Sequence, residues 1–237
     1  MPRTSFELEA ALTHAVAAGD DAAATLLLRE LGANALATGE PAAALRYLRS
    51  AAQHAANIGE GSLGRALGDL AVVLGAIDQR ETAAAAFATA LAHLQRAEDL
   101  EGAAEVAVKR ARSLGDEAAW AAAAWCCAVA GLTADELGAR LAAARTALEA
   151  DDHPRAMRWL EDVAVRFATF LATSGGPEAI WARGELGALW FEAGRYGEAM
   201  PLLARAAHEE ATADHTEAAT RRSHQLSLCL AMLGQPT

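Results

Sequence analysis

Seven histidines and three cysteines are the side chains best able to bind a metal or act as nucleophiles. His54 and His93 lie at the same offset in two similar segments, and equivalent positions of stacked helices lie about 10 Å apart. They cannot share a zinc ion, whose ligands lie at about 2.1 Å. His208 and His215 are two helical turns apart, and no HExxH, paired CxxC or EF-hand loop is present. The sequence therefore predicts no metal site and no cofactor.

A glycine-rich string, GEGSLG, runs from Gly59 to Gly64 and matches the glycine spacing of dinucleotide-binding loops. Such a loop works after a β-strand, where free backbone N–H groups face the pyrophosphate. Here a helical segment precedes the string and Glu60 would repel phosphate, so we predict an ordinary loop. Cys126 and Cys127 have no evident histidine partner, and there is no GxSxG turn. We predict that the chain is not an enzyme, although catalysis by scattered carboxylates stays open.

The composition indicates an all-helical protein. Of the 237 residues, 53% are hydrophobic, and alanine, the strongest helix former, is abundant while valine and isoleucine are few. A net charge of −11 disfavours nucleic acid, because phosphates are bound by Lys and Arg. No uncharged apolar run reaches the length of a membrane span, and Glu7 and Glu9 stand where a signal peptide needs apolar residues. With so few cysteines, we predict a cytoplasmic protein that binds neither nucleic acid nor membranes.

One pattern of small and large apolar residues returns every 35 to 43 residues. Small residues let two helices approach closely, and the larger ones fill the space between layers. A unit of this kind cannot bury its apolar face alone, so it must stack on its neighbours. The three clearest copies are Leu31, Gly32, Ala35, Gly39, Pro41, Ala44, Leu48 and Ala51, then Leu70, Ala71, Leu74, Asp78, Arg80, Ala83, Phe87 and Ala90, and finally Leu186, Gly187, Trp190, Gly194, Tyr196, Ala199, Leu203 and Ala206.

Turn residues separate the predicted helices at regular places. Glycine adopts the left-handed conformation that ends a helix, and aspartate tolerates it and can cap the next helix. A wider interval contains Ser174, Gly175 and Gly176 before Pro177, and we predict a loop and a candidate hinge there. The predicted corners are Gly39, Asp78, Asp116, Asp151, Gly194 and Gly234.

The repeated offsets resemble those of tetratricopeptide repeat (TPR) proteins over about residues 22–235. The repeats are longer than the family's 34 residues, as in bacterial regulatory members. The resemblance implies a right-handed superhelical α-solenoid of about five and a half helix-turn-helix repeats. We predict a single domain over residues 1–237, with an N-terminal capping helix in residues 1–20 and a C-terminal half-repeat in residues 220–237.

In TPR proteins the first helix of each repeat lines a concave groove that holds a partner. Some members clamp a terminal carboxylate with a Lys and Asn pair, but the matching positions here hold Arg29 with Ala33, and Gly68 with Val72. Most of the five tryptophans are predicted to be core residues, above all Trp190. On the family register the groove residues are Arg29, Arg65, Asp69, Arg145, Trp181, Glu185, Arg221, His224 and Gln225.

These features favour a non-catalytic protein–protein interaction module that holds a peptide or a helix of a partner protein in its groove. A ligand- or peptide-sensing regulator is one alternative, because bacterial TPR domains of similar repeat length bind signalling peptides. A self-associating scaffold, such as a homodimer, is a second alternative, because a half-repeat leaves an apolar end open. The sequence does not name the partner.

Overall fold

The computed structural model describes residues 4–173 and 176–234. The chain divides after Gly115 into two compact units, Met1–Gly115 (unit 1) and Asp116–Thr237 (unit 2). The described residues form twelve helices and no strand, which confirms the prediction of an all-α fold. The single domain predicted over residues 1–237 stays a prediction.

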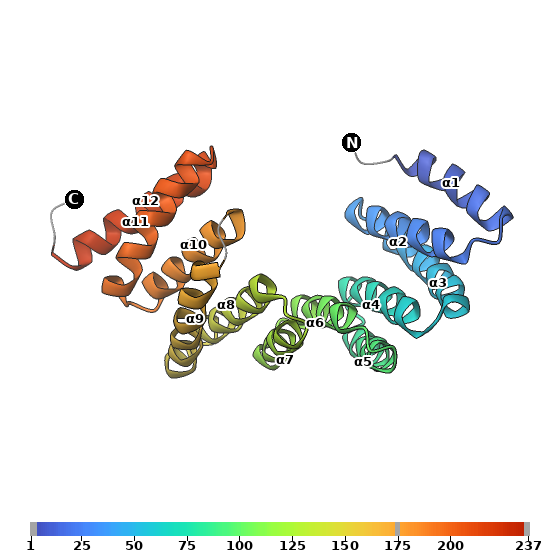
Figure 1. The fold of residues 1–237 in the computed structure, drawn as a ribbon, viewed down its shortest axis with the longest axis horizontal. Coiled ribbons are helices and arrows are strands. Elements are labelled where there is room, and N and C mark those ends of the chain that lie inside the picture. Colours follow the sequence, from blue (N-terminus) through green and yellow to red (C-terminus); the bar gives the residue numbers. More distant parts are fainter. Residues whose placement is uncertain (1–3, 174–175, 235–237) are drawn as a thin grey trace. The chain divides into compact units, whose positions relative to one another are not determined.

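Unit 1 contains six helices packed in chain order. Each helix contacts the next, and α4 also contacts both α2 and α6 (Figure 1). The even-numbered helices are therefore neighbours in one layer, with α3 and α5 packed against them. The helices are α1 (Ser5–Ala17), α2 (Asp21–Ala37), α3 (Pro41–Ile58), α4 (Glu60–Ala76), α5 (Arg80–Arg96) and α6 (Leu100–Leu114).

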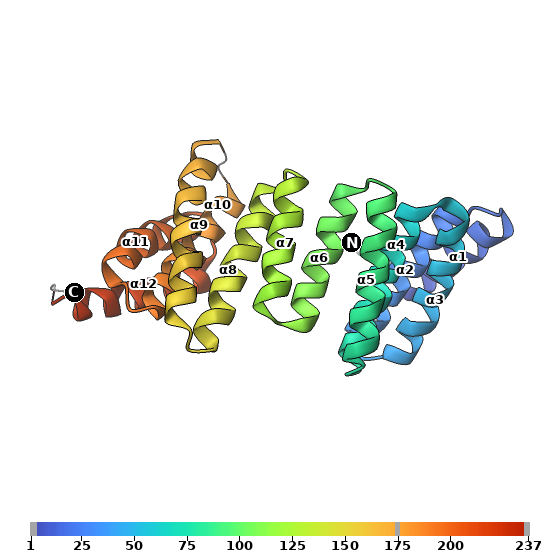
Figure 2. The ribbon, with the colours of Figure 1, turned by 90° about the horizontal axis from the view of Figure 1, so that it is seen from below.

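Unit 2 repeats this arrangement. Consecutive helices pack together, while α10 contacts α8 and α12 as well as its chain neighbours (Figure 2). None of the helices described in either unit is long and apolar enough to cross a membrane. The helices of unit 2 are α7 (Glu117–Val129), α8 (Thr133–Glu149), α9 (His153–Thr173), α10 (Pro177–Glu192), α11 (Tyr196–Thr212) and α12 (Thr216–Met232).

Local chemistry sets the helix ends. Asp20, Asp99 and Asp116 each accept the N–H of the third helical residue, so each satisfies a donor that the helix itself leaves free. Pro41 and Pro177 begin α3 and α10, where the missing N–H of proline costs nothing.

The predicted corners are confirmed, with one shifted by a residue. At the shifted corner Gly115 takes the left-handed conformation with φ of 70°, and Asp116 is extended and caps α7. Of the predicted hinge, Ser174 and Gly175 lie outside the described residues. The other corners have positive φ at Gly39, Asp78, Asp151, Gly194 and Gly234.

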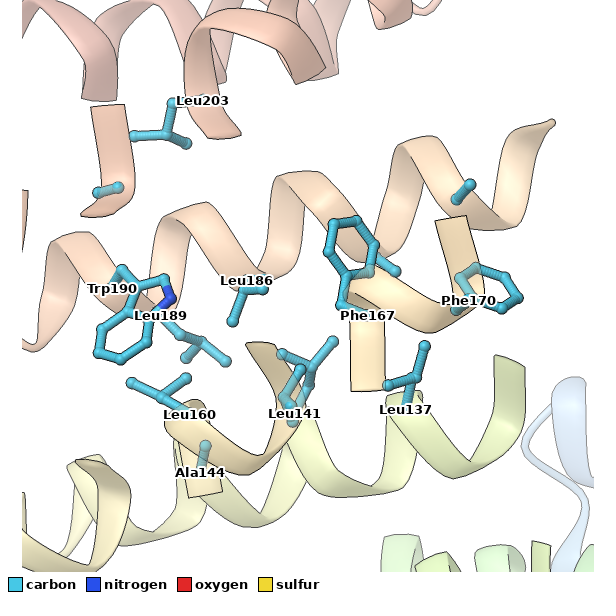
Figure 3. Close-up of a cluster of buried hydrophobic side chains, with 14 of the residues drawn as sticks. Leu137, Leu141, Ala144, Leu160, Phe167, Phe170, Leu186, Leu189, Trp190 and Leu203 are labelled. Atoms are coloured by element: carbon cyan, nitrogen blue, oxygen red, sulfur yellow. The ribbon is translucent and has the colours of Figure 1, made fainter. Parts of the chain in front are cut away.

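The repeated apolar positions form the core of both units. In unit 1 the fully buried Phe87 belongs to one core cluster with Ala71, Ala83 and Ala90. In unit 2, leucines and aromatic rings from α8, α9, α10 and α11 interdigitate around Leu186 (Figure 3). Such alternation of small and large side chains gives close packing, which fixes how each helix lies against the next.

The tryptophans differ from the prediction that most of them are core. Trp190 is buried, as predicted, but Trp120 and Trp159 are only partly buried. Trp125 is 67% exposed and Trp181 is 48% exposed. The buried residues of α7 are Ala119, Ala123, Ala124 and Cys127, and within unit 2 this helix packs against α8.

Candidate functional site

Charged side chains spaced 40 residues apart join the even-numbered helices of unit 1. Arg29 on α2 donates its Nε–H to Asp69 Oδ2 on α4 at 2.5 Å. Lys109 on α6 donates to the other oxygen of Asp69 at 2.5 Å. Asp69 is therefore shared by two cations, one on either side, and all three side chains are mostly buried.

A second set of ion pairs in the same network lies one helical turn closer to the N-terminal ends of α4 and α6. Arg65 on α4 donates to Glu105 on α6 at 2.7 Å and to both carboxylate oxygens of Asp99. Glu105 also accepts from Lys109 at 2.5 Å, which links the two sets. Burial opposes the ionisation of Asp99, but hydrogen bonds from Arg65 and from the Gly102 N–H outweigh it and hold its pKa below the usual range.

A pocket of about 540 Å³ lies beside this network in unit 1. Its walls combine apolar side chains with the Arg29, Asp69 and Lys109 group. At Gly32 an added Cβ would lie 2.6 Å from Leu48 Cγ, so a side chain there would displace Leu48, another residue of the pocket lining. The lining residues are Leu26, Arg29, Glu30, Gly32, Ala33, Leu36, Leu48, Asp69, Val72, Val73, Lys109, Arg112 and Ser113.

Two further charges border the pocket. Arg112 and Glu30 are exposed, and neither makes a hydrogen bond or ion pair within the described part of the chain. Arg29, Lys109 and Asp69 are already paired with one another or with Glu105. A charged group that entered the pocket would therefore meet Arg112 or Glu30 without breaking an existing pair.

Unit 2 has an analogous group on α8, α10 and α12. Glu185 accepts from Arg145 at 2.5 Å and from Arg222 at 2.6 Å. Burial raises the pKa of Glu185, but the two arginines outweigh this effect and hold the pKa below its ordinary value. The Arg222 guanidinium lies over Gly184, where an added Cβ would be 2.8 Å from its Nε. The glycine therefore makes room for the buried arginine.

The other groove residues predicted in unit 2 are spread along α10 and α12. Trp181 lies beside Gly138 of α8, since a Cβ added there would be 3.5 Å from the ring. Arg221 and His224 are exposed, and Arg221 pairs with Glu217 of its own helix at 3.4 Å. Gln225 is part of the Glu185 group only through a 3.4 Å contact with Arg222.

The structure thus brings together Arg29 and Asp69, with Arg65 joined through Glu105, and separately Arg145 and Glu185. It also contains four charged partners that the sequence analysis missed: Asp99, Glu105, Lys109 and Arg222. The missed signal is the 40-residue spacing, which links Arg29 to Asp69 to Lys109 and Arg65 to Glu105.

The residues considered for chemistry have structural contacts. His54 pairs with Asp21 at 2.6 Å, and His93 pairs with Glu60 at 2.5 Å. Burial raises the pKa of the Cys127 thiol to about 11. Among the described residues, no three His, Cys, Asp or Glu side chains are grouped to hold a metal.

The glycine string predicted as a loop is mostly helical. Gly59 alone forms the junction between α3 and α4, and Glu60 to Gly64 form the first turn of α4. Gly64 faces α5, where an added Cβ would lie 2.9 Å from the Ala90 carbonyl oxygen. The close approach of two helices explains this glycine.

Comparisons with known proteins identify the fold. No family model and no curated protein matches the sequence. Two crystal structures of putative kinesin light chain nearly identical TPR-like repeats from Podosopora anserina are similar, one of them of a point variant. The point-variant structure has a TM-score of 0.58 at 18% identity and covers 80% of this chain and 95% of its own. The other has a TM-score of 0.57 at 19% identity, covering 78% and 94%.

The chain has a TPR-like helical-repeat fold. This confirms the all-α solenoid class that the resemblance implied. The identities are low, so the likeness concerns the fold alone.

Proposed function

We propose that this TPR-like protein is a non-catalytic binding module for a peptide or helix of a partner protein. The observation that supports it is the 540 Å³ pocket of unit 1, whose apolar lining includes Ala33, Leu36, Leu48 and Val72. A pocket of this size is in the range that binds ligands and buried side chains. Leu26, another lining residue, is 63% exposed and adds to the apolar surface.

The charged network has a supporting part in this proposal. Arg29 and Lys109 are held by Asp69, so releasing either of them for a ligand would leave a mostly buried carboxylate short of a partner. The apolar lining therefore supplies most of the affinity, and the network holds together α2, α4 and α6, which contribute the pocket's residues. Arg112 remains available to a partner's acidic group.

A second contact region is proposed on unit 2. It consists of the exposed Trp181 ring and the polar residues predicted from the repeat register. Aromatic and arginine side chains are enriched where binding energy concentrates, and the flat ring beside Gly138 offers a face of this kind. The remaining residues are Arg145, Glu185, Arg221, His224 and Gln225.

The setting is also a proposal supported by the sequence alone. We propose a bacterial cytoplasmic protein with longer TPR-like repeats that binds neither nucleic acid nor membranes. The acidic net charge and the low cysteine content of the chain support this setting.

The experiment selects peptides from a displayed random library on the intact protein and measures the affinity of the synthetic peptides by fluorescence anisotropy. The variant Ala33→Trp fills the pocket, and Ala88→Trp adds the same ring on the exposed side of α5 as a matched control. We expect Ala33→Trp to weaken binding at least about tenfold, or about 1.4 kcal/mol, and Ala88→Trp to leave it unchanged. Failure to select any peptide, or equal affinities for both variants, would contradict the proposal.

A further inference from the structure

A second pocket lies within unit 2 and has no part in the proposed function. Its volume is about 380 Å³, and its lining comes from α9, α10 and α11 together with Gly176. None of its lining residues is on α7 or α8, the two helices that follow the unit boundary in the chain. Its apolar lining is Leu171, Ala179 and Ile180. An apolar lining of this kind holds the apolar part of a small ligand.

A buried arginine lines this pocket. Arg183 is only 4% exposed, and its guanidinium lies over the ring of Phe167, 5.8 Å from the ring centroid. Phe167 belongs to the core cluster of unit 2 (Figure 3). Among the described residues, the only polar partner of Arg183 is the carboxylate of Glu209. A guanidinium has several N–H donors, so one carboxylate leaves some of them without an acceptor, which is costly for a buried group.

Positive charge exceeds negative charge in the pocket lining. Glu209 is shared, because Arg205 also donates its Nε–H to Glu209 Oε1 at 2.9 Å. The charged lining residues are therefore two arginines and one glutamate, while Glu178 nearby in the chain is exposed and does not line the pocket. Burial, and then the charge of Arg205, lowers the pKa of Arg183, as expected for a cation without a full counter-charge. A singly charged anion would neutralise this excess.

The start of α10 adds hydrogen-bond donors to the same pocket. Its N-cap is Gly176, and no side chain caps the helix. Backbone N–H groups in a first turn have no acceptor within the helix, and they lie at the positive end of the helix dipole. Ala179 in this turn lines the pocket, and Arg183 follows it at the i, i+4 spacing that places two residues on one side of a helix. The helix start and the arginine can therefore contact one ligand group.

The lining determines the class of ligand. Planar guanidinium groups bind carboxylates through paired hydrogen bonds. An excess of one positive charge matches a carboxylate better than the more highly charged phosphate. The apolar lining requires an apolar body on the ligand, and a volume of about 380 Å³ is near the lower end of ligand pockets, so this body is small.

We propose that this pocket of unit 2 binds a small monocarboxylate, with the carboxylate held by Arg183 and Arg205 and the apolar body held by Leu171, Ala179 and Ile180. The proposal goes beyond the proposed function and is independent of it, because the peptide pocket lies in unit 1.

Isothermal titration calorimetry of the full chain with hexanoate tests this proposal. We expect saturable binding of hexanoate and none of hexanamide, which has the same apolar body without the charge. Acetate and inorganic phosphate should bind more weakly than hexanoate, because neither has an apolar body. Absence of saturable hexanoate binding up to about 10 mM, equal affinity for hexanamide, or tighter binding of phosphate would overturn the proposal.

Variants locate the site. Arg183→Gln removes the charge and keeps a polar side chain, so hexanoate should bind at least about tenfold more weakly. Ile180→Trp fills the pocket without changing its charge and should prevent binding. The matched controls on α9 are Arg158→Gln and Val165→Trp, both at exposed positions, and they should bind as the parent does.

Circular dichroism checks that each variant keeps the helix content of the parent. If Arg183→Gln does not fold, the comparison of Ile180→Trp with Val165→Trp decides the question, because neither of these changes a charge. Parental affinity for hexanoate in a folded Arg183→Gln or Ile180→Trp variant would refute the assignment of this pocket.

Discussion

Arg65 on α4 donates two hydrogen bonds, both of 2.9 Å, to the two carboxylate oxygens of Asp99. The same carboxylate accepts the Gly102 N–H at 2.9 Å and so caps α6. Asp99 therefore caps the start of α6 and also pairs α6 with α4, its neighbour in the layer. The position at which α6 begins and the way it packs on α4 are determined together.

The first prediction concerns this double role. Asp99→Ala removes the cap and leaves the Arg65 guanidinium, 29% exposed, with Glu105 as its remaining carboxylate. A lost cap costs about 1 kcal/mol, and a partly buried donor without its partner costs about 1–3 kcal/mol more. We expect the free energy of unfolding to fall by about 2–4 kcal/mol, as measured by urea denaturation.

Asp20→Ala is the matched control. Asp20 caps α2 by accepting the Ala23 N–H at 2.9 Å, and it makes no ion pair within the described residues. This variant should lose only the contribution of the cap, about 1 kcal/mol. Equal losses for the two variants would mean that the pairing with Arg65 adds nothing to stability.

The second prediction concerns acid. Hydrogen bonding to His54, and then to Asn57, lowers the pKa of Asp21, and hydrogen bonding to His93 lowers the pKa of Glu60. A carboxyl group whose pKa is lowered by folding stabilises the protein above its unfolded pKa, near 4, and loses that contribution as the pH falls through the folded pKa. Stability measured by urea denaturation should therefore decline below about pH 4.

The double variant Asp21→Asn, Glu60→Gln should make this decline shallower, because the substituted amides do not titrate. Glu101→Gln, which alters an exposed acid in the first turn of α6, should leave the slope as it is. An unchanged slope in the double variant would show that the two histidine pairs do not contribute to the acid response.

Much of the fold follows from local sequence signals. Leu31, Ala83 and Leu203 were assigned to the core from repeated offsets, and all three are buried, because stacked repeats force equivalent positions into equivalent contacts. Gly39 and Asp78 were assigned to corners from turn chemistry alone, and both have positive φ. These features depend only on neighbours in sequence or on the repeat period.

The candidate site was harder to predict, since it depends on side chains that meet between helices. Arg29 and Asp69 were both predicted as groove residues, but the sequence did not show that they form an ion pair with each other. Most of the five tryptophans were expected in the core, yet within unit 2 α7 packs against α8 and Trp125 is 67% exposed. Periodicity identifies an apolar face without showing what covers it.

The third prediction compares two glycines that the sequence alone does not distinguish. At Gly64 an added Cβ would lie 2.6 Å from Leu94 Cγ and 2.9 Å from the Ala90 carbonyl oxygen, so α5 would have to move. This overpacking costs about 1–3 kcal/mol and outweighs the gain of up to about 1 kcal/mol from replacing a helical glycine by alanine. At Gly197 nothing lies within 4 Å, so only the gain applies. We expect Gly64→Ala to lower the urea midpoint and Gly197→Ala to raise it. A Gly64→Ala variant as stable as the parent would show that α4 and α5 are not in this close contact.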